Sequence, residues 1–231
     1  MGLNSTIHSN QNTVAFPHVS RNCFAAMQSK SSIALTAPYH VEEFSSLNKV
    51  LTNCDPNCSK PEHFVAIGSG NLRYMDVALK YCDTYNAVEM NMDDHIKPEM
   101  QSYIKRNNNV NLINKSFSDV LKSELPESSK VFFFLFNVFP YIPNAIASIK
   151  NLANPGDVIM ISSWNNQSFT ARRLRNIYYN HLQSSDTSCP FVPPAYATQN
   201  YLDDVEKQTA LFTKKQYRRQ SSITDILTCQ V

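Results

Sequence analysis

The distribution of hydrophobic and polar residues along the chain predicts strands and helices in alternation. Short, nearly uninterrupted apolar runs are typical of parallel strands buried on both faces of a sheet. Five such runs are HFVAIG (63–68), YNAVEMN (85–91), NVNLINKS (109–116), KVFFFLFNV (130–138) and VIMISSW (158–164). This order predicts an α/β fold: a doubly wound, mostly parallel sheet with helices on both faces.

The segments between these runs carry the predicted helices, because their apolar residues recur near the spacing of one helix face. They are NLRYMDVALKYC (71–82), DDHIKPEMQSYIKRN (93–107), FSDVLKSEL (117–125) and IPNAIASIKNLANPGD (142–157). In the second of them, Asp93 or Asp94 is a suitable N-cap, and Pro98 fits a helix if it lies in the first turn.

The two ends of the chain differ from this central region. Residues 1–40 are rich in Ser, Asn and Thr and read as a partly ordered lead-in. After them, Val41, Phe44, Leu47 and Leu51 follow helical spacing, which predicts a short N-terminal helical extension. We therefore expect an extension with lid helices over residues 1–55 and a sheet domain over residues 56–231.

The C-terminal part of the sheet domain is expected to complete the sheet and the binding site. QSFTARRLRNIYYNHLQ (167–183) predicts a helix, and SCPFVPPAYATQ (188–199) reads as a proline-rich loop. QTALFTKKQYRR (208–219) and SSITDILTC (221–229) are the candidate terminal strands.

Composition narrows the function classes only slightly. The net charge of +2 is lower than a strongly nucleic-acid-binding domain usually carries, and no apolar run is long enough to span a membrane. The cysteines read as free thiols of a reducing compartment, and a cytoplasmic location is expected. Cys54 and Cys58 form a lone C-x3-C pair, too few ligands for a zinc site, so no metal is expected.

A pair of glycines provides the first indication of chemistry. Two of only four glycines, Gly68 and Gly70, directly follow the first predicted strand and enclose Ser69. Glycines at the carboxyl end of a strand let the backbone approach a ligand closely. Glu89 ends the second predicted strand, 19 residues after Gly70, where a carboxylate can accept hydrogen bonds from ribose hydroxyls.

The third position of the glycine motif distinguishes two classes of nucleoside ligand. A dinucleotide fingerprint has the form G-x-G-x-x-G, and this chain has Arg73 at the third glycine position. That departure counts against NAD-type ligands and favours S-adenosylmethionine.

Five segments together resemble the class I S-adenosylmethionine-dependent methyltransferases, over about residues 60–165. They are VAIGSGN, VEMNMDDHI, NLINKSFSDVL, KVFFFLFNVF and LANPGDVIMIS. The resemblance implies S-adenosylmethionine as cofactor, with Gly68 and Gly70 against its methionine part, Ser69 between them and Glu89 on its ribose.

The same resemblance implies the adenine contacts. Met90 would pack on the adenine ring, and Ser116 and Phe117 would flank its amino edge. The family often has Asp where this chain has Ser116, so the adenine contact departs from the family pattern there.

Candidate catalytic residues follow the fourth strand and lie in the tail. NVFPY (137–141) is similar to the Asn-Pro-Pro-Tyr motif of enzymes that methylate planar nitrogens, but has one residue inserted. The resemblance places Asn137 at the end of strand four, near cofactor and substrate. Tyr141 is a candidate for the substrate side, although a packing role explains it at least as well. His181 is a candidate base, although an ordinary surface or core histidine explains it better.

The sequence therefore predicts an S-adenosylmethionine-dependent methyltransferase that acts on a small-molecule acceptor. Three alternatives stay open. One is another transfer from the same cofactor, such as its aminobutyl arm, as in enzymes resembling nicotianamine synthase. The second is methylation of RNA or protein, and the third is a non-catalytic binding module with this fold. The oligomeric state cannot be predicted from these patterns.

Overall fold

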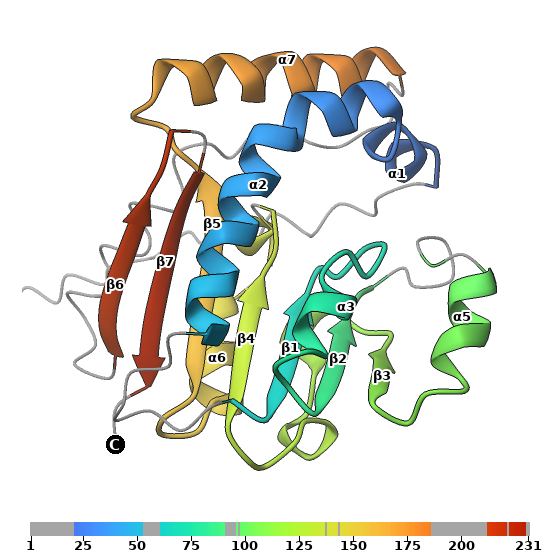
Figure 1. Cartoon of the computed structure of the whole chain (residues 1–231), viewed down its shortest axis with the longest axis vertical. Helices are drawn as coiled ribbons and strands as arrows, with labels where there is room; N and C mark the ends of the chain where they lie inside the picture. Colours follow the sequence, from blue (N-terminus) through green and yellow to red (C-terminus); the bar gives the residue numbers. More distant parts are fainter. Residues whose placement is uncertain are drawn as a thin grey trace, which may run out of the picture.

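The computed structural model describes residues 21–52, 61–90, 96, 98–136, 138–142, 144–185, 212–220 and 222–229. Within them lies one seven-stranded sheet with the order β3-β2-β1-β4-β5-β7-β6 (Figure 1). Its strands are β1 (His63–Ile67), β2 (Thr84–Val88), β3 (Val110–Ile113), β4 (Lys130–Phe134), β5 (Val158–Trp164), β6 (Phe212–Arg218) and β7 (Ser222–Cys229).

The sheet is parallel except for one strand. Each neighbouring pair among β1 to β5 is parallel, and chain order reverses between β1 and β4. Strand β7 is antiparallel to both β5 and β6, so β6 points in the same direction as β5. The predicted doubly wound α/β sheet is confirmed, including the five central strands and the two terminal strands that complete it.

In the described part of the chain, five of the segments predicted to be helical contain an α-helix, with bounds that differ from the predicted ones. The helices are α1 (Arg21–Met27), α2 (Lys30–Thr52), α3 (Met75–Ala78), α5 (Pro98–Ile104), α6 (Ala145–Leu152) and α7 (Phe169–Ser185), with 3-10 turns η1 (Phe117–Asp119), η2 (Lys122–Glu124) and η3 (Phe139–Tyr141). Pro98 is the first residue of α5, as expected. The segment 117–125 forms two 3-10 turns instead of one helix. The predicted N-caps and the proline-rich loop lie outside the described residues.

Two apolar layers cover the two faces of the sheet. Alternate residues of β1 point to opposite faces, so Phe64 and Ala66 join one cluster while Val65 and Ile67 join the other. The first cluster includes residues of α2, α3 and α5, and the second includes residues of α6 and η1. Helices on both faces leave the carboxyl edge of the strands as the place for a ligand.

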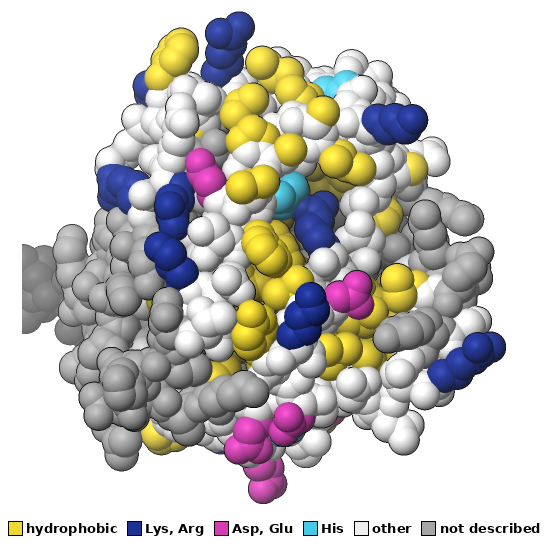
Figure 2. Space-filling model, viewed as in Figure 1, with side chains coloured by type: hydrophobic (Ala, Val, Ile, Leu, Met, Phe, Trp, Pro, Cys, Tyr) yellow, Lys and Arg dark blue, Asp and Glu magenta, His cyan; other side chains and the backbone are white. Residues whose placement is uncertain are grey.

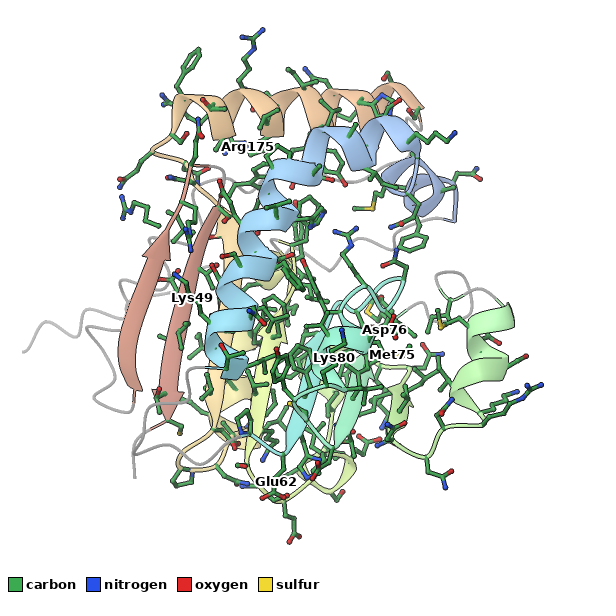
Figure 3. All side chains as sticks on the ribbon, viewed as in Figure 1. Lys49, Glu62, Met75, Asp76, Lys80 and Arg175 are labelled. Carbon is green, nitrogen blue, oxygen red and sulfur yellow. The ribbon has the colours of Figure 1, made fainter. Side chains whose placement is uncertain are left out.

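A third cluster lies above the carboxyl ends of β4 and β5. Helices α1, α2 and α7 meet there, and Figure 1 shows α7 crossing above the sheet. Its buried members are Cys23, Tyr39, Trp164, Ala171, Tyr178, Tyr179 and Leu182. Figure 3 shows Arg175 on the side of α7 that faces the sheet, where it is 6% exposed and donates to Asn166 Oδ1 at 2.6 Å.

The predicted N-terminal helical extension is confirmed, but its helices begin earlier than the spacing of apolar residues indicated. Helix α2 begins at Lys30, so much of the expected lead-in is helical and packs on the sheet and on α7. Val41 is 68% exposed and Phe44 is 41% exposed, although their spacing suggested a buried face. Leu47 and Leu51 are buried as expected, and the buried face also carries polar residues, among them Thr36 and Glu43.

The state of the cysteines and the hydropathy of the helices can also be compared with the sequence predictions. Cys82 and Cys229 are thiols, but Cys23 is disulfide-bonded, which corrects the expectation of thiols throughout. Cys54 and Cys58 lie outside the described residues. Within the described part of the chain, no helix has the length and apolar character needed to cross a membrane.

Candidate functional site

A cavity of about 150 Å³ lies where α1, α2 and α7 meet the carboxyl edge of the sheet. Its lining includes Gly68, Ser69, Gly70 and Glu89 from the first two strand ends, and Leu135, Phe136 and Val138 after β4. Figure 2 shows a face of the molecule on which hydrophobic side chains fill a hollow, with a histidine and a basic side chain beside them.

A smaller cavity of about 30 Å³ adjoins the first one. The two share Gly68, Glu89 and Val138, so together they form one trough along the strand ends. Met90, Ser116 and Phe117 line the smaller cavity. The structure therefore brings together these three residues, which the resemblance assigned to an adenine site. That role itself stays a prediction.

Glu89 lies at the junction of the two cavities. Its Oε2 accepts the backbone N–H of Gly70 at 3.0 Å, and its Oε1 accepts the backbone N–H of Met90 at 2.9 Å. These two bonds fix the carboxylate across the trough. Each carboxylate oxygen can accept more than one hydrogen bond, so Glu89 can still accept bonds from ligand hydroxyls.

The two glycines are required by the backbone itself. Gly68 and Gly70 have φ values of +66° and +51°, a region that L side chains rarely adopt. A Cβ on Gly68 would lie 2.6 Å from Val138 Cγ2, so the loop after β4 packs directly on the glycine backbone. Between them, Ser69 is 2% exposed, and its Oγ makes no hydrogen bond with any described residue.

On the other side of the larger cavity, a buried carboxylate on α2 connects this helix to the loops at the strand ends. Glu43 is fully buried; its Oε1 accepts the backbone N–H of Phe136 at 2.8 Å, and its Oε2 accepts the Tyr74 hydroxyl at 2.5 Å. Burial by itself would raise the pKa of Glu43, but its hydrogen bonds with His40, Tyr74 and Phe136 hold that pKa below its ordinary value. Glu43 therefore joins α2 to the loops after β1 and β4.

His40 lies one helical turn before Glu43 and lines the larger cavity. Its Nδ1 is 3.3 Å from Glu43 Oε2, its ring packs at 4.7 Å on the ring of Phe136, and the Arg73 guanidinium contacts both ring nitrogens. Burial lowers the pKa of His40 despite the opposing effect of Glu43. The imidazole is therefore neutral at pH 7.

Sequence reasoning missed His40 and Glu43. The available signal was the polar residues at helical spacing in α2, since Thr36, His40 and Glu43 recur every three or four positions. Such spacing shows which residues share a helix face. It does not show that the face is buried.

Tyrosines from α7 and from the loop after β4 complete the wall of the larger cavity. Tyr141, Tyr178 and Tyr179 all line it. Burial, reinforced by the neighbouring Tyr179, raises the pKa of both Tyr141 and Tyr178. These hydroxyls therefore stay protonated and can donate hydrogen bonds but cannot act as bases at neutral pH.

Among the other predicted catalytic residues, the structure does not bring His181 into this group. Asn137 lies outside the described residues. His181 lines neither cavity, and its Nε2 is 3.5 Å from Ser29 Oγ near the start of α2. Trp164, at the end of β5, packs against the rings of Tyr39 and Phe136.

Comparisons with known proteins bear on the fold. No protein-family model matches the sequence, and no curated protein matches it. The N-methyltransferase NodS from Bradyrhizobium japonicum is similar in structure, with a TM-score of 0.53 at 12% identity over 84% of this chain and 98% of that one. An rRNA methylase from Streptococcus thermophilus gives 0.51 at 11% identity, over 81% and 96%.

A third similar structure is the plantazolicin methyltransferase BpumL, solved with S-adenosylhomocysteine (SAH) and a triazolic plantazolicin analog. Its TM-score is 0.50 at 12% identity, over 91% of this chain and 96% of that one. The strand order of this sheet, in which β7 is the one antiparallel strand, is consistent with this structural similarity. The fold is that of the class I S-adenosylmethionine-dependent methyltransferases.

In this methyltransferase fold, the trough has features that fit S-adenosylmethionine. The unpartnered Ser69 hydroxyl can donate to a ligand, and Gly68 and Gly70 expose backbone at the larger cavity. Glu89 can accept bonds from ribose hydroxyls between the two cavities. The donor and acceptor set therefore suits a nucleoside with a polar tail.

Proposed function

We propose that this protein is an S-adenosylmethionine-dependent methyltransferase that acts on a small-molecule acceptor. The observation that carries the proposal is the position of Glu89, held by the N–H groups of Gly70 and Met90 at the junction of two cavities. A carboxylate there can bind both hydroxyls of a ribose, while the cavities on either side accommodate the two ends of the cofactor.

Different residues of the trough bind different parts of the cofactor. Glu89 accepts hydrogen bonds from the ribose, Ser69 donates to the methionine part, and Met90, Ser116 and Phe117 surround the adenine. When bound, S-adenosylmethionine supplies an electrophilic methyl group. The chain's main task is then to align an acceptor with that group and to exclude water, which can account for a large part of the rate.

The cover of the larger cavity supports a small acceptor over a nucleic-acid strand. Helices α1, α2 and α7 all contribute side chains to its lining. Phe24, Met27 and Tyr179 from these helices make that lining largely apolar. Such a covered, apolar cavity with a few polar groups is typical of small-molecule sites.

Calorimetry with S-adenosylmethionine and SAH tests the cofactor assignment. We expect both to bind the full-length protein, and Glu89→Gln to bind them more weakly. If neither binds, both the methyltransferase and the other transferase activities are excluded.

Product analysis then separates the reactions, with acceptor candidates added to the cofactor. SAH as the product supports methyl transfer. Thioadenosine products would instead indicate transfer of the aminobutyl arm and would contradict the proposal.

A further inference from the structure

Helices α2 and α7 carry most of the large hydrophobic side chains that are exposed to solvent. Among the residues that the structure describes, seven such side chains are exposed, and five of the seven lie on these two helices. The five are Ile33, Val41, Phe44, Phe169 and Ile177, with exposed fractions from 41% to 72%. Single apolar side chains scattered over a surface need no explanation, but a concentration on two neighbouring helices indicates an interaction site.

The exposed residues of each helix share one face. On α2, Ile33, Val41 and Phe44 recur near helical spacing, on the side away from the buried Glu43. On α7, six residues spaced along one side line a shallow groove: Phe169, Arg172, Arg173, Asn176, Ile177 and Asn180.

The two exposed faces adjoin each other. Helices α2 and α7 pack together, and Ser29 Oγ, just before α2, lies 3.5 Å from His181 Nε2 on α7. Figure 2 shows hydrophobic side chains gathered over the upper part of this face of the molecule, with Lys and Arg side chains around them. We call this region the α2–α7 surface; its exposed residues are Lys30, Ile33, Val41, Phe44, Phe169, Arg172, Arg173 and Ile177.

The exposed charges of the α2–α7 surface are all positive. They belong to Lys30, Arg172 and Arg173. The two acids of α2 are engaged inside the protein, because Glu43 is fully buried and Glu42 accepts hydrogen bonds from the N–H and hydroxyl groups of Ser222. Helix α7 contains no acidic residue. The surface therefore combines exposed apolar side chains with a net positive charge.

This combination fits an anionic membrane. Apolar side chains beside basic ones are typical of helices that lie in the interface of a bilayer, where the cations meet the anionic lipid headgroups. A second copy of the chain would bring like charges together, which opposes association. RNA phosphates would pair with the cations but would leave the aliphatic side chains of Ile33 and Val41 in water.

We propose that the α2–α7 surface docks on membranes that contain anionic phospholipids. In the docked state α7 lies along the bilayer surface, with Phe169 and Ile177 among the lipid chains and the neighbouring arginines at the headgroups. The opposite side of α7 carries Tyr178 and Tyr179, which line the larger cavity. Docking therefore places that cavity directly under the membrane surface. The inference does not depend on the proposed methyl transfer.

Sedimentation of the full-length protein with lipid vesicles tests the proposal. One set of vesicles contains phosphatidylcholine alone, and the other contains about one-third phosphatidylserine. We expect at least about tenfold tighter binding to the vesicles with phosphatidylserine, because each cation near an anionic surface adds to the attraction. Added salt should weaken this binding through screening. Equal binding to both sets, or no binding to either, would overturn the proposal.

Removal of charge assigns the electrostatic part to α7. The double variant Arg172→Gln, Arg173→Gln should bind the anionic vesicles about twenty-five-fold more weakly, since each cation accounts for a factor of about five. The matched control is Lys105→Gln, Arg106→Gln, which removes two adjacent exposed cations just after α5, beside the edge strand β3 (Figure 1). An equal loss in the two double variants would show that only total charge matters and would contradict docking through α7.

Removal of an apolar side chain assigns the part of the binding that salt does not screen. Phe169→Ser should weaken binding about tenfold at both low and high salt, because a phenylalanine then no longer enters the bilayer. Leu121→Ser is the control, since Leu121 is 60% exposed and Phe169 is 72% exposed, but Leu121 lies just before η2. Unchanged binding by Phe169→Ser would refute insertion of α7.

The two other partners give different results. A dimer in light scattering that Val41→Ser dissociates, without any binding to vesicles, would assign the surface to a second copy and overturn the proposal. Binding of a labelled single-stranded RNA that requires Arg172 and Arg173, again without vesicle binding, would assign the surface to nucleic acid and overturn it as well. SAH affinity should be the same in the surface variants and the wild type, so a failure of docking leaves the proposed function standing.

Discussion

Glu43 accepts the backbone N–H of Phe136 at 2.8 Å, although the two residues are 93 positions apart. The bond joins a helix of the N-terminal extension to the loop after the fourth strand. Phe136 itself has a φ of 31°, uncommon for a residue with a side chain, and this hydrogen bond helps to hold it there. Helix α2 is thus part of the cavity wall.

We expect the protein to lose stability in acid, through His40 and Glu43. The pKa of each is lowered in the folded state, from 6.5 for His40 and from 4.5 for Glu43. The unfolded chain therefore binds more protons, and the free energy of unfolding falls as pH decreases, first below 6.5 and again below 4.5.

Urea unfolding at pH values spanning these two steps measures this loss. His40→Gln should remove the first step and keep the second. A free energy of unfolding that stays level between neutral pH and the lower step would contradict the role of His40.

Glu89→Ala is expected to weaken SAH binding by about 1–3 kcal/mol, because it removes charge-assisted hydrogen bonds to the ribose. It also deprives the N–H groups of Gly70 and Met90 of their acceptor. Calorimetry measures the change. Glu62→Ala is the matched control, since Glu62 projects from the opposite end of the sheet (Figure 3). Equal affinity of both variants would refute the ribose role.

Gly70→Val is expected to abolish SAH binding and leave the fold largely intact. A Cβ on Gly70 meets only the Phe24 ring, at 3.6 Å, so the added atoms strain the backbone and enter the cavity more than they disturb the core. Gly156→Ala separates these effects, because Gly156 has φ +87° and open space around it. It should cost about 1–2 kcal/mol of stability and no affinity. SAH binding by Gly70→Val at the wild-type level would mean that the glycine loop after β1 only forms a turn and does not contact the ligand.

Lys130→Met is expected to lower the free energy of unfolding by about 3–5 kcal/mol, because it leaves a buried carboxylate without its cation. Lys130 Nζ lies 2.9 Å from Asp157 Oδ2, and both side chains are 1% exposed. Lys80→Met provides the comparison, since Lys80 is exposed beside α3 (Figure 3) and should change stability by less than about 0.5 kcal/mol. Denaturant unfolding of the two variants side by side measures the difference in the free energy of unfolding. An equal loss in both variants would contradict the role of the buried ion pair.

Several features of the trough could be predicted from the sequence because they depend on local order. Parallel strands end at the same edge of a sheet, so Gly70 after β1 and Glu89 after β2 had to lie near each other once both runs were recognised as strands. The same reasoning brought Ser116 and Phe117, after β3, to the smaller cavity. Helix lengths were less predictable, since α3 has only 4 residues in a segment expected to be helical throughout.

The sequence by itself determined the sheet, its carboxyl edge and the glycine–glutamate trough, because apolar runs and their spacing reflect burial along the chain. Only the tertiary structure decided which face of α2 is covered. Helical spacing groups Val41 with Phe44 and His40 with Glu43, but it does not say which group is buried. A carboxylate can be buried only where hydrogen-bond donors are present to pair with it. The donors to Glu43 come from Tyr74 and Phe136, 31 and 93 positions away.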